Sequence, residues 1–480
     1  MAEAMCNQSL LTDLYQLTML AGYYDQNKLQ EQSCFELYFR SLPFAGGFCI
    51  AAGLEQVLDY LEGLNFGPQE LDYLRSLSIF SEAFLDWLAD FRFQGRVYAL
   101  AEGECVFPGQ PILRVEASLP EAQLIESALL NLVNFQTLVA TKAARVVLAA
   151  QGDTVLEFGL RRAQGSNGAL AASRAAYIGG CHATSHCLAG KTYQIPVKGT
   201  HAHSWVMAFP TELEAFRAYA QSFPEACTLL VDTYDTLQSG LPNAITVGLE
   251  LREKGYELAG IRLDSGDLAA LSKAARARLD EAGLQKTKIV ASNDLDEYKI
   301  AALKAQGARI DIWGVGTNLV TCKDEPALGG VYKLTASGPL GQDMQARIKV
   351  SSNPIKTTTP GAKQCYRFYT ASQRMIADML ALSSEAKPRA DQEYPCYATD
   401  DRSQCRTLKA PVVRPLLNLV YDGKRLGPSP TLEAIRANTI RSLESLPQGV
   451  KNLSNPDTYW VGLSQELSQL REELLKSGPE

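Results

Sequence analysis

The segment LAGIRLDSGD, residues 258–267, begins as a short apolar run and ends in charged and small residues. Five other segments share this pattern: TVLEFG (154–159), QIPVKGT (194–200), TLLVDTYDT (228–236), KIVASNDLD (288–296) and RIDIWGVGT (309–317). Alanine- and leucine-rich stretches separate most of them, and strands alternating with helices indicate a parallel sheet. Because the carboxyl ends of barrel strands converge at one mouth, the pattern predicts an α/β barrel with its site there.

The rest of the chain has a different pattern. Residues 95–116 alternate apolar and polar side chains around Gly and Pro, which predicts short antiparallel strands with tight turns. Residues 120–150 are apolar at helical spacing and predict a long helix. Residues 349–369, rich in Pro, Thr and Lys, predict a loop and an edge strand, and two closing helices are expected at about 430–446 and 462–477.

Composition narrows the class of protein. The 480 residues are 46% hydrophobic and 21% charged, as in globular domains, and the net charge is 46 − 53 = −7. A mildly acidic chain is a poor non-specific binder of nucleic acid or acidic membranes. Eleven cysteines without a CxxC pair indicate buried thiols in a reducing compartment. The start MAEAMCNQ does not resemble a signal peptide and no apolar run approaches about 20 residues, so we expect a cytoplasmic protein.

Two glycine-containing turns follow predicted strands. In GVGTN, residues 314–318, backbone N–H groups and the Thr317 hydroxyl can approach a phosphate, although a plain tight turn explains the motif equally well. In RLDSGD, Arg262 can clamp a carboxylate or phosphate, and Asp264 and Asp267 can accept ribose hydroxyls or reach Mg²⁺. The alternative is a salt-bridged surface turn, which the apolar segment before it disfavours.

The segment EFGLRRAQG, residues 157–165, begins at another strand end. Phe158 can stack on a planar substrate, and Arg161 with Arg162 suits a diphosphate. The alternative is that these residues have no binding role, with Phe158 in the core and the two arginines in solvent. Taken together, these turns suit a phosphoribosyl donor that meets a flat heterocycle, with fixed charges stabilising an oxocarbenium-like transition state.

All four histidines lie between residues 182 and 203. His182 and His186 would share a helix face, as in zinc sites, but residue 183 is Ala where the catalytic-zinc motif has Glu. A nucleophilic or acid–base histidine at the barrel mouth is the favoured interpretation. Either His201 or His203 fits it on these grounds.

Nine motifs of the sequence resemble those of the nicotinate phosphoribosyltransferase family. They are LLTDLYQLTM (10–19), EFGLRRAQG (157–165), SRAAYIGG (173–180), PVKGTHAHSW (196–205), LLVDTYDT (229–236), IRLDSGDL (261–268), VASNDLDE (290–297), WGVGTNLVT (313–321) and NPIKTTTPGAKQCYR (353–367). The resemblance runs in order through most of the chain.

The resemblance implies an irregular α/β barrel, residues 151–334, and a second α+β domain. That domain would combine residues 1–150 with chain returning at about 335–410, followed by a C-terminal helical segment, residues 411–480. It also implies a reaction of NAD biosynthesis, in which nicotinate and phosphoribosyl diphosphate give nicotinate mononucleotide and diphosphate. ATP hydrolysis through a phosphohistidine, Mg²⁺ and a homodimer with shared active sites are expected, without nucleic-acid or membrane partners.

The resemblance also assigns residues. It makes His203 the phosphohistidine of the GT-x-A-H-S motif, so that His201 fills the variable position. The nicotinate-binding residues are expected to be Tyr15, from the neighbouring subunit, with Phe158, Thr200 and Arg262. The phosphoribosyl diphosphate residues are expected to be Arg161, Asp264, Ser292, Gly316 and Thr317, with Asp264 also catalytic and Asp267 a candidate for Mg²⁺. His182 and His186 depart from the family pattern and receive no role.

Three alternatives remain at this stage. A nicotinamide phosphoribosyltransferase would place an acidic group where this chain has His201 and would not need Arg262 to meet a carboxylate. A metallohydrolase would use the histidines as a zinc site, and a non-catalytic relative would bind nucleotides without turnover.

Overall fold

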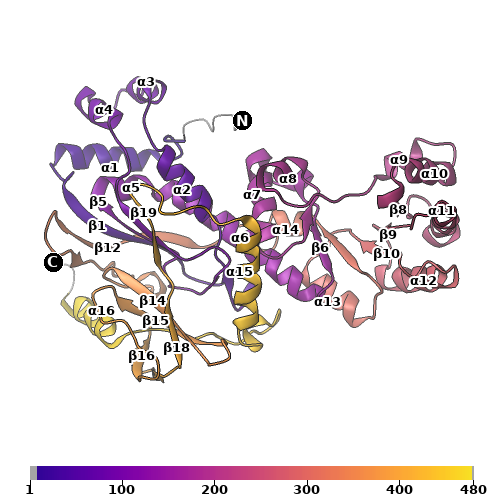
Figure 1. Cartoon of the computed structure of the whole chain (residues 1–480). Coiled ribbons are helices and arrows are strands. Elements are labelled where there is room, and N and C mark those ends of the chain that lie inside the picture. Colours follow the sequence, from indigo (N-terminus) through magenta and orange to yellow (C-terminus); the bar gives the residue numbers. More distant parts are fainter. Residues whose placement is uncertain (1–7, 400, 478–480) are drawn as a thin grey trace. The chain divides into compact units, whose positions relative to one another are not determined.

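The predicted strand–helix alternation is found in one of two units into which the chain divides (Figure 1). The computed structural model describes residues 8–399 and 401–477. Unit 1 comprises Met1–Leu138 and Ala327–Glu480, and unit 2 comprises Val139–Pro326. Helix α6, Glu126–Ala150, runs through the first boundary, so unit 2 begins within this helix and not after it.

Unit 2 contains a six-stranded sheet in which every strand pair is parallel. The strands are β6 (Thr154–Glu157), β7 (Ala183–Thr184), β8 (Thr228–Leu230), β9 (Gly260–Leu263), β10 (Lys288–Ala291) and β11 (Ile312–Val315). Their order is β7-β6-β11-β10-β9-β8, with β7 and β8 at the two edges, so the sheet forms a half-barrel in the described chain. The predicted fold class, α/β with a second α+β unit, is confirmed.

One predicted strand is wrong. Residues 194–200 do not form a strand of the sheet; the two-residue strand β7 pairs with β6 in their place. Pro196 has no N–H to donate to a ladder, and the segment contributes only an isolated bridge between Val197 and Thr184. The segment therefore runs beside β7 and leads into the loop that contains Thr200 and His203.

Helices connect the parallel strands. They are α7 (Gly165–Ile178), α8 (Cys187–Tyr193), α9 (His203–Met207), α10 (Glu212–Ser222), α11 (Leu241–Glu253), α12 (Leu268–Glu281), α13 (Glu297–Ala305) and α14 (Thr317–Val320). Side chains that accept hydrogen bonds from free N–H groups start several of them: Thr211 for α10, Asp267 for α12 and Asp296 for α13. Helix α12 packs against β9 and β10, so its apolar face covers the centre of the sheet.

Unit 1 contains two six-stranded sheets. The first, antiparallel, has the order β13 (Gln345–Ala346), β12 (Gly330–Pro339), β1 (Glu31–Phe39), β5 (Leu113–Ser118), β3 (Arg96–Ala99) and β19 (Asn418–Asp422). The second has the order β17 (Cys405–Leu408), β16 (Tyr394–Ala398), β20 (Val461–Leu463), β15 (Met375–Leu382), β14 (Lys363–Tyr369) and β18 (Val412–Pro415). A small pair joins β2 (Cys49–Ile50) to β4 (Cys105–Val106). The helices are α1 (Leu14–Asp25), α2 (Leu54–Gly63), α3 (Pro68–Ser76), α4 (Glu82–Ala89), α5 (Leu119–Leu124), α15 (Leu432–Ser445) and α16 (Gln465–Ser477).

Two expectations for the C-terminal third are corrected. Strand β14, expected at a sheet edge, lies between β15 and β18, because its side chains are buried along most of its length. Residues 411–480 contain β18, β19 and β20 as well as the two predicted helices, so they are part of the unit 1 sheets and not a helical segment.

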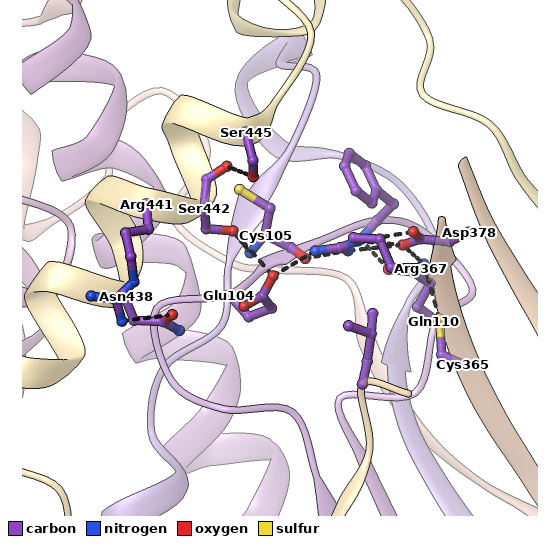
Figure 2. A network of polar contacts seen from close by, with 12 residues as sticks. Glu104, Cys105, Gln110, Cys365, Arg367, Asp378, Asn438, Arg441, Ser442 and Ser445 are labelled. Carbon is purple, nitrogen blue, oxygen red and sulfur yellow. Dashed lines mark hydrogen bonds and ion pairs between the residues drawn. The ribbon is translucent and has the colours of Figure 1, made fainter. Parts of the chain in front are cut away.

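The interior of unit 1 is built around a buried arginine. Figure 2 shows the Arg367 side chain between Glu104 and Asp378. Its Nη2 donates to Asp378 Oδ2 at 2.8 Å and its Nη1 to Glu104 Oε1 at 2.6 Å, and neither the Arg367 nor the Asp378 side chain is exposed. Tyr459 donates a further hydrogen bond to Asp378 at 2.8 Å. Such buried charges are tolerated only when they are fully paired, so this network holds the strands in one register.

Within the described residues, none of the helices combines the length and the hydropathy that crossing a bilayer requires.

Candidate active site

Arg262 and the residues around it form the centre of the candidate site. Arg262 lies on β9 and its guanidinium donates to three side chains, one from each of three segments: Ser292 Oγ at 2.8 Å, Thr200 Oγ1 at 3.0 Å and Asp264 Oδ1 at 2.9 Å. Arginine has five N–H groups, so one N–H on each Nη atom is left over after these bonds. Two adjacent N–H groups match the two oxygens of a carboxylate.

Asp264 is the charged partner of Arg262. Burial of its carboxyl favours the neutral form, but the hydrogen bond from Ser292 and the positive charge of Arg262 outweigh this and hold the pKa of Asp264 below its usual value. The Asp264 backbone N–H donates to Asp232 Oδ2 at 2.9 Å, which fixes the turn after β9. The carboxylate is therefore ionised at neutral pH and held in one orientation.

His203 lies beside this carboxylate. Its Nε2 is 3.8 Å from Asp264 Oδ2, and its Nδ1 is 3.1 Å from Thr233 Oγ1. The imidazole is 41% exposed, so a substrate can reach it. Thr233 holds the Nδ1 side of the ring and leaves Nε2 on the side of Asp264, where a neutral imidazole can act as a nucleophile.

His201, the other histidine of this loop, has a structural environment. Its ring is buried, with Nε2 accepting from the Leu230 N–H at 3.2 Å and an edge contact to Tyr219 at 4.7 Å between ring centres. Burial lowers the pKa of His201, and the positive charge of Arg262 adds to the effect. The ring is neutral and joins the loop to β8.

The remaining two histidines do not share a helix face. His182 precedes β7 and its Nδ1 accepts from the Val155 N–H at 3.1 Å, whereas His186 follows β7 as the N-cap of α8 and is buried. In residues 8–399 and 401–477, no group of three or more His, Cys, Asp or Glu side chains is arranged to hold a metal ion. The geometry therefore gives no support to the metallohydrolase alternative.

Phe158 is placed by a glycine on the neighbouring strand β11. It follows β6, and its ring lies against Gly314, where a Cβ would come within 2.7 Å of Phe158 Cδ2. The Phe158 ring centre is 5.8 Å from the Arg262 guanidinium carbon. An aromatic face and a guanidinium are thus brought together, which suits a flat ring that carries a carboxylate.

The residues expected to bind the phosphates lie at the ends of β6 and β11. Arg161 and Arg162 are exposed in a short 3₁₀ turn, Leu160–Arg162, directly after Phe158. Gly316 precedes α14 and Thr317 is its first residue, and Gly316 packs so closely that a Cβ would lie 3.1 Å from the Phe158 carbonyl oxygen. These groups are accessible and adjacent to the Phe158 loop.

The turn that directly follows Ser292 is strained, and a side chain of helix α14 holds it. Asn293 and Asp294 have φ values of 97° and 46°, which non-glycine residues rarely adopt. The Asn318 side chain donates to the Asp294 carbonyl at 3.0 Å and to the Leu295 carbonyl at 3.1 Å. Strain of this kind is maintained only where the surroundings determine the backbone, and the two Asn318 hydrogen bonds supply that support.

Two of the expected residues are described separately, because Asp267 has a capping role in its own helix and Tyr15 belongs to unit 1. The Asp267 Oδ1 atom caps α12 by accepting from the Ala269 and Ala270 N–H groups, both at 3.0 Å. Tyr15 lies on α1 of unit 1, and half of its surface is exposed. Its expected contact with a substrate in a partner subunit stays a prediction.

The motifs did not single out two residues that the structure places in the site. Asp232 fixes the Asp264 turn, and its Oδ1 is buried without a hydrogen-bond partner among the described residues. Thr233 holds His203. Both follow β8 in the quoted segment LLVDTYDT, so their position at a strand end was the signal available.

Comparisons with known proteins identify the family to which the chain is similar. Three family models match consecutive parts of the chain: the nicotinate phosphoribosyltransferase N-terminal domain (10–134), the nicotinate phosphoribosyltransferase family (154–337) and the C-terminal domain (362–471). Nicotinate phosphoribosyltransferase of Bacillus subtilis is 46% identical over 463 residues, which is 95% of this chain and 93% of the relative. The Bos taurus protein of the same name is 37% identical over 98% of this chain and 97% of its own length. The crystal structure of human nicotinic acid phosphoribosyltransferase matches with a TM-score of 0.84 and 35% identity, over 96% of this chain and 99% of that one.

Proposed function

The chain belongs to the nicotinate phosphoribosyltransferase family, and on this premise we propose how its site carries out the reaction. The enzyme transfers the phosphoribosyl group of phosphoribosyl diphosphate to nicotinate, which gives nicotinate mononucleotide and diphosphate for NAD biosynthesis. The observation that carries the proposal is Arg262, held by three side chains beside Phe158 with two N–H groups left for a ligand carboxylate.

Nicotinate binds with its ring on Phe158 and its carboxylate on Arg262, with Thr200 beside it. Selection against nicotinamide follows from this cation, because an amide facing Arg262 would direct its N–H donors at N–H donors. The acidic group expected of an amide-selective pocket is absent at position 201, where the buried His201 is neutral and turned toward Leu230.

Phosphoribosyl diphosphate binds along the strand ends. Asp264 and Ser292 accept hydrogen bonds from the ribose hydroxyls, Gly316 and Thr317 hold the 5′-phosphate, and Arg161 meets the diphosphate. As the bond from C1′ to the diphosphate oxygen breaks and the bond to the nicotinate nitrogen forms, the ionised Asp264 stabilises the positive charge on the ribose.

Mg²⁺ fits the donor set at this mouth. Carboxylate oxygens are its preferred ligands, and the buried Oδ1 of Asp232, without a hydrogen-bond partner among the described residues, lies in the residue that fixes the Asp264 turn. Asp264 and Asp232 are the residues that would face the metal, and Asp267 is less suited because its Oδ1 caps α12. The ion, when bound, offsets charge on the departing diphosphate.

ATP hydrolysis is coupled through His203. Nε2 attacks the γ-phosphorus of ATP, the bond to the β-phosphate oxygen breaks, and ADP leaves while the phosphoryl group stays on the imidazole until water removes it. Thr233 at Nδ1 and Asp264 near Nε2 orient the ring. The active enzyme is a cytoplasmic homodimer in which Tyr15 of one subunit covers the nicotinate in the other.

A product assay tests the proposal. Nicotinate, phosphoribosyl diphosphate and Mg²⁺ should give nicotinate mononucleotide, faster with ATP, and nicotinamide should compete poorly. In H203A the basal reaction should remain and the stimulation by ATP should be lost. If H203A responds to ATP as the parent does, His203 is not the phosphorylated residue.

A further inference from the structure

Glu157, the last residue of β6, is a buried carboxylate that the reaction outlined above does not use. Its side chain is 1% exposed, and in the described part of the chain it forms no salt bridge. A buried carboxylate without a cation needs several hydrogen-bond donors. Three groups donate hydrogen bonds to the Glu157 carboxylate. The Gly159 N–H donates to Oε1. The hydroxyls of Ser173, at 2.9 Å, and of Thr184 donate to Oε2.

His186 completes this network. Its Nδ1 is 3.2 Å from Ser173 Oγ, and its backbone N–H donates to Thr184 Oγ1 at 3.0 Å. Ser173 has one hydroxyl hydrogen, and the carboxylate of Glu157 is the strongest acceptor within its reach. The His186 Nδ1–H therefore donates to Ser173, which donates to Glu157. His186, to which the sequence assigned no role, is therefore the outermost member of this series of hydrogen bonds.

The network holds both segments that carry the nicotinate pocket. Phe158 lies between Glu157 and Gly159, so the residues on both sides of the aromatic ring are fixed by one carboxylate. Thr184 pairs with the segment that leads to Thr200, since its N–H donates to the Pro196 carbonyl at 3.0 Å and its carbonyl accepts from the Lys198 N–H at 3.0 Å.

We propose that Glu157, with Ser173 and His186, is a positioning network that sets Phe158 and the Thr200 loop for nicotinate. The proposal rests on the proposed function, in which Phe158 and Thr200 contact nicotinate. It requires that damage to the network weakens nicotinate binding selectively, because Arg161, Gly316 and Thr317, which hold the phosphates, have no direct hydrogen bond to it.

The variant E157Q keeps the shape of the side chain and replaces an acceptor by an NH₂ group that faces a donor. We expect the KM for nicotinate to rise roughly tenfold, as for the loss of one buried charged hydrogen bond, while the KM for phosphoribosyl diphosphate stays within twofold. E212Q is the matched control, because Glu212 is 5% exposed and accepts from Asn243 at 2.9 Å and from Ser239, neither of which belongs to the Glu157 network. This control should lower the Tm without changing the ratio of the two KM values.

His186 provides a second and milder pair of variants. H186N keeps a donor near the position of Nδ1 and should retain the parent KM for nicotinate, whereas H186L removes the donor and should raise it. This pair decides the matter if E157Q does not fold.

The outcomes separate the two levels of the proposal. A parent chain that forms no nicotinate mononucleotide refutes the proposed function and the network with it. An active parent, with the nicotinate KM of E157Q and H186L unchanged or with both KM values moving together as the Tm falls, refutes the network alone.

Discussion

Arg262→Lys removes the guanidinium and keeps the charge. The three acceptors of Arg262 lie on different segments, and its remaining N–H pair is free for the substrate. A lysine ammonium donates from a single atom, so it cannot meet Ser292, Thr200 and a bidentate carboxylate together. One charge-assisted hydrogen bond to nicotinate contributes about 2 kcal/mol and a lost neutral hydrogen bond about 1 kcal/mol. A total loss of about 3 kcal/mol corresponds to a fall of roughly 150-fold in kcat/KM for nicotinate.

The assay is steady-state formation of nicotinate mononucleotide with nicotinate varied and the other substrates saturating. R276K is the matched control, because Arg276 on α12 also donates to three partners: Asp280 at 2.9 Å, the Thr287 carbonyl at 2.7 Å and the Leu284 carbonyl at 2.8 Å. Its loss should affect stability and leave nicotinate kinetics unchanged. If R262K keeps kcat/KM within threefold of the parent, Arg262 does not bind the nicotinate carboxylate.

Three further predictions follow from other contacts. Because the pKa of Asp264 is depressed in the folded chain, its ionised form contributes stability above the unfolded pKa of about 3.9, and this is lost as the pH falls through the folded pKa. D264N should therefore flatten the decline of Tm between about pH 5 and pH 3, and an unchanged decline would contradict the assignment. D378A removes one of the two carboxylates that pair with the buried Arg367 and should lower the free energy of unfolding by about 3–5 kcal/mol, measured in urea, whereas a loss below about 1 kcal/mol would show that the pair is not needed. Inactive Y15A and R262A chains, unfolded and refolded together, should recover about one quarter of the parent sites if Tyr15 acts in the partner's site, and none if each site is built from one chain.

Most strands of the unit 2 sheet could be predicted because buried parallel strands have a distinctive sequence pattern. The runs around Leu156, Leu230, Leu263, Ala291 and Val315 are apolar on both faces, as burial in a parallel sheet requires, and each ends in a polar residue or a glycine. The prediction of a strand at 194–200 is wrong because Pro196 has no N–H for a ladder of hydrogen bonds. The prediction gave more weight to the β-propensity of the neighbouring residues than to this proline. The interior position of β14 could not be foreseen, since its neighbours β15 and β18 are decided by long-range pairing.

The sequence by itself determined the chemistry available at the strand ends: Arg262, Asp264, Phe158, Thr200 and His203 all stand where a polar residue follows an apolar run or in the loop beside one. Only the tertiary structure decided how those groups are used. It turned three of the five N–H groups of Arg262 toward three segments, buried His201 while exposing His203, and connected His186 to Glu157 through Ser173. The physical reason is that an apolar or charged pattern is a property of neighbouring residues, whereas a hydrogen bond between β9, β10 and a distant loop exists only after the sheet has brought them together.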